Sequence, residues 1–282
     1  MSKSIFGYTH ILLFCLLFLG VGTMCHAKKK KKVVTTYYLP VPDNMPLAAK
    51  AEDAMSMFAE PRMLLTGDKT QGKYFASNRF GIDVSRYQEN INWNEVAKDD
   101  RVTFVYLKAT ESTGLVDRTY KRNLAGARGV GLPVGVYHFF SPNTPAQQQL
   151  SNFMRAVNPS TQDLIPIVDV EVAPRRKSQI VPFLKRLRAF VDGVERYFGC
   201  KPMIYTSQYF YKEYLKGKFL DCPIMLAKYS EGVPEVGEDI RFLVWQFTSS
   251  GSIRGIVGNV DRSCLMNHYT VDDIRYYGKK KQ

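Results

Sequence analysis

The sequence contains little histidine and cysteine, and it has no apolar run long enough to span a membrane. Its 282 residues include 4 histidines and 5 cysteines, which do not group with acids at metal-ligand spacing. It also lacks a Walker loop, zinc-finger spacing and a stripe of basic and aromatic residues. We therefore expect a protein that needs no metal ion or other cofactor and does not bind nucleic acid.

The longest apolar run, Ile11 to Gly22, lies near the N-terminus after the single charge of Lys3. It falls short of the roughly 20 residues that a membrane-spanning helix needs, and the small residue Ala27 closes the stretch as a cleavage site would. The pattern predicts a signal peptide over residues 1–27 and export to the periplasm, the envelope or the medium. Lipidation at Cys25 is disfavoured because a bulky residue precedes it.

The formal net charge is +13, and two lysine runs, Lys28–Lys32 and Lys279–Lys281, supply most of it. We therefore predict a basic linker or N-terminal arm over residues 28–78 and a basic tail over residues 278–282. Such runs are usually solvated, but on an exported protein they could hold the chain near an anionic envelope surface. Residues 79–277 are ample for one domain with its own core, and we expect a monomer.

Removal of the signal peptide would leave three cysteines, Cys200, Cys222 and Cys264. Cys200 and Cys222 each stand just before an apolar run that begins with proline, so they could pair in an oxidising compartment if those runs are neighbouring strands. Buried free thiols are at least as good an interpretation, because an unpaired cysteine packs like a small hydrophobic residue. The sequence leaves both alternatives open.

From Phe80 onward, short apolar runs alternate with longer stretches of helical periodicity, which is typical of parallel strands joined by helical crossovers. The longest helical stretch is "SQIVPFLKRLRAFVDGVERYFG", whereas the last three runs are joined by segments too short or too rich in glycine for full helices. We predict an α/β fold: an irregular TIM-like (β/α) barrel with five βα units followed by three strands with short connections. The eight strand candidates are "FGIDV", "FVYLKAT", "PVGVYHFF", "IPIVDVEV", "PMIYTS", "PIMLAKY", "FLVWQFT" and "NVDRSCL".

The run "IPIVDVEV" ends in two acids, Asp169 and Glu171, which point to the same side if the strand extends through both. In barrels of this kind the chemistry lies at the C-terminal ends of the strands. Like charges at close range resist joint ionisation, and glycoside cleavage needs one protonated and one ionised carboxyl group. The alternative is structural, with both acids paired to Arg175 and Arg176 in the next loop.

Six segments in order, "FGIDVSRYQ", "FVYLKATE", "GVGLPVGVYHFF", "IVDVE", "PIMLAKY" and "VWQFTSSGSIRGIVGNVD", resemble the glycoside hydrolase family 25 lysozymes from about Arg79 to Asn267. The resemblance implies an N-acetylmuramidase that cuts the β-1,4 bond between N-acetylmuramic acid and N-acetylglucosamine in peptidoglycan glycan strands. It implies that Glu171 is the general acid and that Asp169 stabilises the substrate acetamido group or an oxocarbenium ion. Asp83 and Asp261 match two further acids of the cleft, while Ser263 stands where the family often has Asn.

Aromatic and amide side chains near the predicted strand ends are candidates for binding sugars: Tyr137, Tyr205, Tyr229, Trp245 and Gln246. We expect His138, the neighbour of Tyr137 on the opposite face of the strand, to be satisfied in the core. Lys108 and Glu111 could form an ion pair at the rim or touch substrate.

Two other functions remain as alternatives: a chitinase-like barrel glycosidase and a non-catalytic barrel that binds cell walls. The apolar residues before Asp169 argue against the first, because that signature carries additional aspartates there. The retention of all four acids argues against the second. The sequence leaves open whether the wall attacked is the cell's own, a competitor's or a host's.

Overall fold

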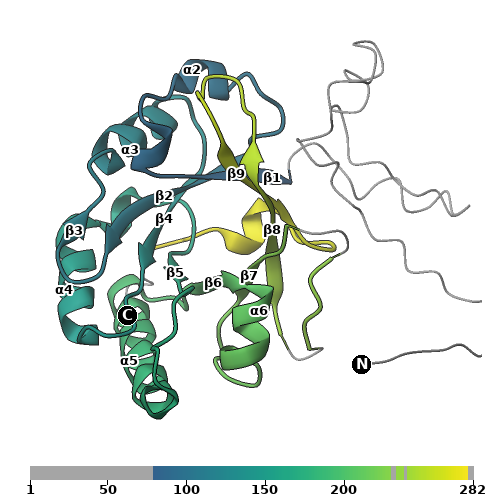
Figure 1. The fold of residues 1–282 in the computed structure, drawn as a ribbon. Coiled ribbons are helices and arrows are strands. Elements are labelled where there is room, and N and C mark those ends of the chain that lie inside the picture. Colours follow the sequence, from purple (N-terminus) through teal and green to yellow (C-terminus); the bar gives the residue numbers. More distant parts are fainter. Residues whose placement is uncertain (1–78, 230–232, 238–239, 279–282) are drawn as a thin grey trace, which may run out of the picture. The chain divides into compact units, whose positions relative to one another are not determined.

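A computed structural model describes residues 79–229, 233–237 and 240–278, and in it eight strands form a closed barrel (Figure 1). The predicted signal peptide, the arm over residues 28–78 and the lysines of the C-terminal tail lie outside the described residues. All eight predicted apolar runs form strands of the barrel. These are β1 (Phe80–Val84), β2 (Phe104–Glu111), β4 (Val134–Phe139), β5 (Ile167–Asp169), β6 (Met203–Ser207), β7 (Ile224–Ala227), β8 (Phe242–Gly251) and β9 (Val260–Leu265).

The barrel closes between its first two strands. Neighbouring strands follow the order β1-β9-β8-β7-β6-β5-β4-β2, and β1 pairs with β2 to complete the ring. Strand β9 runs antiparallel to both of its neighbours, β1 and β8, whereas the other neighbours in the ring are parallel. A two-residue strand, β3 (Leu115–Val116), pairs antiparallel with the end of β2. The predicted irregular TIM-like barrel is confirmed.

The connections between strands are unequal, as predicted, but the first contains less helix than the expected βα unit. It holds only single helical turns, η2 (Arg86–Gln88) and α2 (Trp93–Val96). The side chain of Asn92 caps the start of α2, and Ala97 ends this helix. No helix is described between β7 and β9. The remaining elements are α3 (Tyr120–Gly129), α4 (Ala146–Ala156), η3 (Pro159–Thr161), η4 (Lys177–Gln179), α5 (Ile180–Phe198), α6 (Gln208–Phe210), the π-helical turn η5 (Tyr211–Leu215) and η6 (Val271–Ile274).

Helix α5 shows why the sequence folds in this way locally. Apolar residues recur at three- and four-residue intervals, so one stripe of the helix packs against the barrel, and Gly199 ends it with a φ of 80° that favours glycine. None of the described helices is both long and apolar enough to cross a membrane. The buried stripe comprises Phe183, Leu187, Phe190, Val191, Val194 and Phe198.

His138 lies in the core between strand and helix, as predicted. Its ring is fully buried and packs 4.6 Å from the ring of Phe190. Nδ1 is 2.7 Å from the hydroxyl of Thr110, and Nε2 is 3.2 Å from Oε1 of Gln149. Burial lowers the pKa of His138 to about 4, so the imidazole is neutral and satisfied at neutral pH.

The three described cysteines, Cys200, Cys222 and Cys264, are free thiols. Burial raises the pKa of Cys200 and of Cys222 to about 11. The structure therefore favours packing over pairing for these residues.

Candidate active site

A pocket opens at the C-terminal end of the parallel strands, where the antiparallel β9 begins, and collects seven of the nine predicted site residues. Strands β1, β4, β5, β6, β7, β8 and β9 all contribute side chains to it, which is the arrangement that a closed barrel produces at its mouth. Its lining consists of Asp83, Tyr137, Ile167, Asp169, Glu171, Tyr205, Met225, Gln246 and Asp261.

Strand β5 delivers two acids into different environments. The strand ends at Asp169, three residues before the predicted end at Val172, although the Val170 amide still donates to the Tyr205 carbonyl at 2.9 Å. Asp169 is 5% exposed, whereas Glu171 is exposed to solvent. The last strand residue therefore lies within the barrel, and the acid that follows reaches its opening.

Burial is the main reason that the pKa of Asp169 lies well above its usual range. The negative charge of Glu171 and a hydrogen bond between the two carboxyl groups raise it further, while Lys108 opposes the shift. Burial and the neighbouring negative charge thus both favour the protonated form of Asp169.

Asp83 and Asp261 form a second pair of acids on the opposite side of the ring. They are register partners in the antiparallel pairing of β1 and β9, so their side chains point to the same face. Burial raises the pKa of Asp83 to about 6, and burial together with the charge of Asp83 raises that of Asp261 to about 7. Both acids can change protonation state near neutral pH.

Gln246 links the acids to two tyrosines. Its Nε2 donates to Oδ2 of Asp83 at 3.0 Å, and its Oε1 accepts the hydroxyls of Tyr205 at 2.8 Å and Tyr229 at 2.6 Å. The Ser263 hydroxyl also donates to Oδ2 of Asp83, at 3.0 Å. Ser263, which the sequence left in doubt as support for Asp261, therefore supports Asp83 instead.

Lys108 contributes to the electrostatics of the site, although its sequence pattern only weakly indicates such a role. Its Nζ lies 2.8 Å from Oε2 of Glu111, so the predicted ion pair is present, and 5.0 Å from the centre of the Phe139 ring. The lysine is only 8% exposed and lowers the pKa of Asp169. A lysine inside an apolar strand run, three residues before a glutamate, is the signal that could have identified it.

Tyr229 and Trp245 do not line the pocket. Tyr229 is 55% exposed and is joined to the site by its hydrogen bond to Gln246. Trp245 is 3% exposed, and its indole donates to the Lys228 carbonyl at 3.0 Å. Successive strand residues point to opposite faces, so Gln246 in the pocket directs Trp245 away from it, and the predicted sugar contact of Trp245 has no support in this geometry.

The structural alternative for the acid pair also lacks support. Arg175 and Arg176 are exposed, and neither forms an ion pair with Asp169 or Glu171 in the part of the chain that the structure describes. The carboxyl groups are thus left available to a ligand. Within the same residues, no group of three or more His, Cys, Asp or Glu side chains could hold a metal ion.

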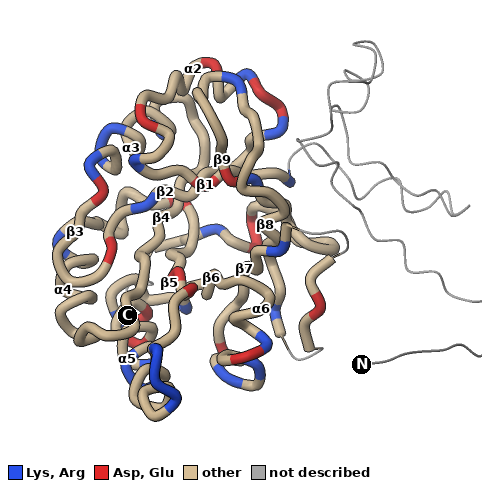
Figure 2. The backbone as a smooth tube through the Cα atoms, in the orientation of Figure 1, with Lys and Arg blue, Asp and Glu red and all other residues tan. Residues whose placement is uncertain are grey.

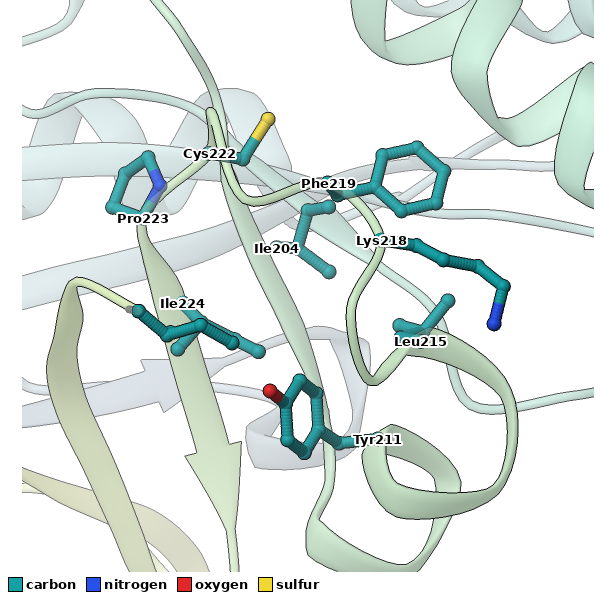
Figure 3. A pocket seen from close by; sticks show the side chains of 9 residues that line it. Ile204, Tyr211, Leu215, Lys218, Phe219, Cys222, Pro223 and Ile224 are labelled. Carbon is teal, nitrogen blue, oxygen red and sulfur yellow. The ribbon is translucent and has the colours of Figure 1, made fainter. Parts of the chain in front are cut away.

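A second, mostly apolar pocket lies beside η5 and the entrance to β7, remote from the acids (Figure 3). Figure 3 shows Tyr211 and Leu215 on one side and Cys222, Pro223 and Ile224 on the other. Lys218 is the charged residue of its lining. With no acid in the lining, this pocket cannot supply acid and base groups for glycoside cleavage.

Comparison with known proteins gives a consistent result. The model of glycosyl hydrolases family 25 matches residues 82–256. The Escherichia coli K12 protein YegX is 38% identical over 185 residues, covering 64% of this chain and 67% of its own length. The autolytic lysozyme of Clostridium acetobutylicum is 32% identical over 181 residues, covering 64% and 54%. A family 25 glycosyl hydrolase structure from Bacillus anthracis superposes with a TM-score of 0.62 at 27% identity, covering 70% of this chain and 91% of that one.

Proposed function

The chain belongs to glycosyl hydrolases family 25, and from that premise we propose that this glycoside hydrolase is a lysozyme that degrades peptidoglycan. The bond we assign to it is the β-1,4 linkage between N-acetylmuramic acid and N-acetylglucosamine. The observation that carries the proposal is the ring of four acids at the strand ends, Asp83, Asp169, Glu171 and Asp261, all lining one pocket. The lysozyme and muramidase relatives support the choice of substrate.

In this mechanism, the pair of acids at the end of β5 supplies the proton for cleavage. Glu171, the exposed member of the pair, gives the proton to the glycosidic oxygen as the bond to the anomeric carbon breaks. Positive charge then develops on that carbon, and the negative charge of the Asp169 carboxylate stabilises it. The buried position of Asp169 strengthens this interaction, because its charge is poorly screened by water.

We assign to Asp169 the task of holding the substrate's own 2-acetamido group. The carboxylate accepts the acetamido N–H while the acetamido oxygen attacks the anomeric carbon from the face opposite the leaving group. Water then opens the resulting ring, and Glu171, now ionised, takes a proton from that water. The second acid pair, Asp83 with Asp261, adds negative charge around the sugar as positive charge develops on it.

The tyrosines and the amide in the pocket complete the proposed binding site. Tyr137 and Tyr205 have pKa values well above the usual range because of burial, so both remain neutral phenols that can pack against a sugar. Gln246 holds Asp83 and Tyr205 in fixed positions through its hydrogen bonds. We also propose that the enzyme is exported before it acts on the wall. The signal peptide predicted for this step lies outside the described residues.

Digestion of purified peptidoglycan, followed by borohydride reduction and mass spectrometry, tests the proposal. A muramidase leaves N-acetylmuramic acid at the new reducing ends, which reduction converts into muramitol. Glucosaminitol ends, or no new reducing ends at all, would contradict the assignment. Chitin oligomers serve as the comparison substrate, and faster hydrolysis of these would favour the chitinase-like alternative.

A further inference from the structure

The loop from β5 to α5 carries a cluster of cations that the proposed reaction does not use. Arg175, Arg176 and Lys177 are consecutive, all three are exposed, and none forms an ion pair within the residues that the structure describes. Figure 2 shows Lys and Arg gathered at the N-terminal end of α5. By contrast, Arg188 and Lys201 each contact two acids. Three unpaired cations in a row indicate a surface available to an anionic ligand.

This basic loop, residues 175–177, begins next to the acid pair. Arg175 lies four positions after Glu171 in the chain, a distance of at most about 14 Å even for a fully extended chain. Pro174 is buried and anchors the segment between them. A ligand seated against Glu171 can therefore reach the basic loop with a substituent a few residues long.

An open groove lies at Gln179, two residues beyond the basic loop in the chain. Gln179 and Arg186 form one wall, and residues 143–147, from the β4–α4 loop and the first turn of α4, form the other. The guanidinium group of Arg186 ties the two walls together, because its Nη2 donates to the Pro142 carbonyl at 2.6 Å. The two walls of the groove are thus held together, and the exposed Lys177 precedes Gln179 in one of them by two residues.

The substrate class follows from charge. A glycan of N-acetylglucosamine alone is neutral and offers nothing to three cations. Each muramic sugar of peptidoglycan carries a lactyl carboxyl group, and the peptides that extend from it place free carboxylates farther from the glycan. Arginine binds carboxylates in bidentate fashion. We infer that Arg175, Arg176 and Lys177 bind the peptide carboxylates of the substrate, so that the enzyme prefers glycan strands that still carry their peptides; this inference rests on the proposed peptidoglycan substrate.

Two substrates that differ only in the peptides test the inference. Soluble glycan strands are compared before and after an amidase has removed their peptides, using the parent protein and the variant Arg175→Gln/Arg176→Gln/Lys177→Gln. We expect KM for peptide-bearing strands to rise on the order of fivefold in the variant, as the loss of three exposed ion pairs implies. The value of kcat should not change. The inference assigns the loop to carboxylates of the peptide and not to the lactyl carboxylate that the amidase leaves on each muramic sugar, so KM for stripped strands should not change either. High salt should remove the difference between parent and variant.

The matched control is Arg155→Gln/Arg196→Gln/Lys216→Gln, which removes the same charge from exposed residues. Arg155 and Arg196 lie in the last turns of α4 and α5, on the side away from the pocket. This control should leave KM for both substrates unchanged, and equal melting temperatures should exclude unfolding in either variant. An equal change in KM for both kinds of strand in the loop variant would overturn the inference.

Equilibrium binding of both kinds of strand is measured in addition to hydrolysis. Failure of the proposed function can then be distinguished from failure of the inference about the basic loop. If the parent cleaves neither strand, the proposed function fails, while tighter binding of the peptide-bearing strand to the parent than to the loop variant still supports the inference. Vesicles containing phosphatidylglycerol give the last comparison. Loss of vesicle binding in the variant, with unchanged binding of both strands, would assign the loop to a lipid surface instead.

Discussion

Asp83 and Asp261 stand directly opposite each other in the antiparallel pairing of β1 with β9. Two carboxyl groups in this position repel each other when both are ionised. Burial is the main reason that their pKa values are raised to about 6 and about 7, and the charge of Asp83 adds to the shift of Asp261. The site is therefore less stable in its fully ionised form than a neutral version of the same barrel would be.

Replacing Asp261 by Asn should stabilise the protein at neutral and alkaline pH. Since its folded pKa is raised to about 7 from 3.8, the folded state keeps a proton that the unfolded chain has lost, and the parent loses stability as pH rises from about 4 to about 7. The variant has no carboxyl group at this position, so it does not lose stability in this way as the pH rises. Thermal melts from pH 4 to pH 8 should show a gap that widens to the order of 2 kcal/mol, a value reduced from the full shift because the side chain is partly exposed.

The control for that experiment is Asp100→Asn, because Asp100 is exposed and has no ion pair among the described residues. Its melting temperature should follow the parent at every pH. A constant gap between Asp261→Asn and the parent across this range would show that the pKa of Asp261 is not raised.

Replacing Glu171 by Gln should reduce peptidoglycan hydrolysis on the order of 1000-fold, since the amide cannot donate the proton that cleavage needs. Binding of the glycan should persist, as measured by sedimentation of the variant with insoluble wall. The comparison variant is Glu213→Gln, an exposed glutamate in η5, which should retain parental rates. Activity of Glu171→Gln within a few-fold of the parent would remove the residue from the role of general acid.

Gln246→Met keeps the length of the side chain but removes its hydrogen bonds to Asp83, Tyr205 and Tyr229. We expect kcat/KM to fall on the order of tenfold, because one buried acid and two phenols lose a partner. Trp245→Phe is the matched change on the opposite face of β8 and should lower only the melting temperature. A raised KM for Trp245→Phe with unchanged kcat would show that the indole reaches the sugar after all.

Thiol titration distinguishes the two interpretations of the cysteines. With pKa values near 11, Cys200 and Cys222 carry little thiolate at pH 8 and should react slowly with Ellman's reagent in the native protein. In denaturant all described cysteines should react. A mass 2 Da below that of the reduced protein would instead indicate a bridge between Cys200 and Cys222.

The strands were predictable because each is an apolar run bounded by polar or helical sequence, and the ends of those runs place Asp83, Asp169 and Asp261. The periodicity of two also identified His138 as a core residue. The same rule, applied to β8, would have shown that Trp245 and Gln246 cannot both face the barrel interior. For Trp245, the resemblance to the family's motifs predicts a sugar contact that the alternation of side chains in β8 does not favour.

Other features of the site depend on contacts between segments far apart in the chain. The hydrogen bond from Ser263 to Asp83 joins residues separated by 180 positions, and the closeness of Lys108 to Asp169 depends on how β2, β4 and β5 associate in the ring. Local pattern carries no information about such partners. The position of the last paired residue in β5 likewise depends on its neighbours, so the sequence run extended beyond the observed strand.

Strand β9 brings Asp261 to the site and at the same time joins β1 to β8. A ribosome-bound chain that has not yet reached Val260 therefore has an open sheet with an unpaired edge on its first strand and lacks one of its four acids. Completion of the ring and completion of the acid set are a single event late in synthesis. For an enzyme aimed at a structural polymer, this couples the onset of activity to the end of folding.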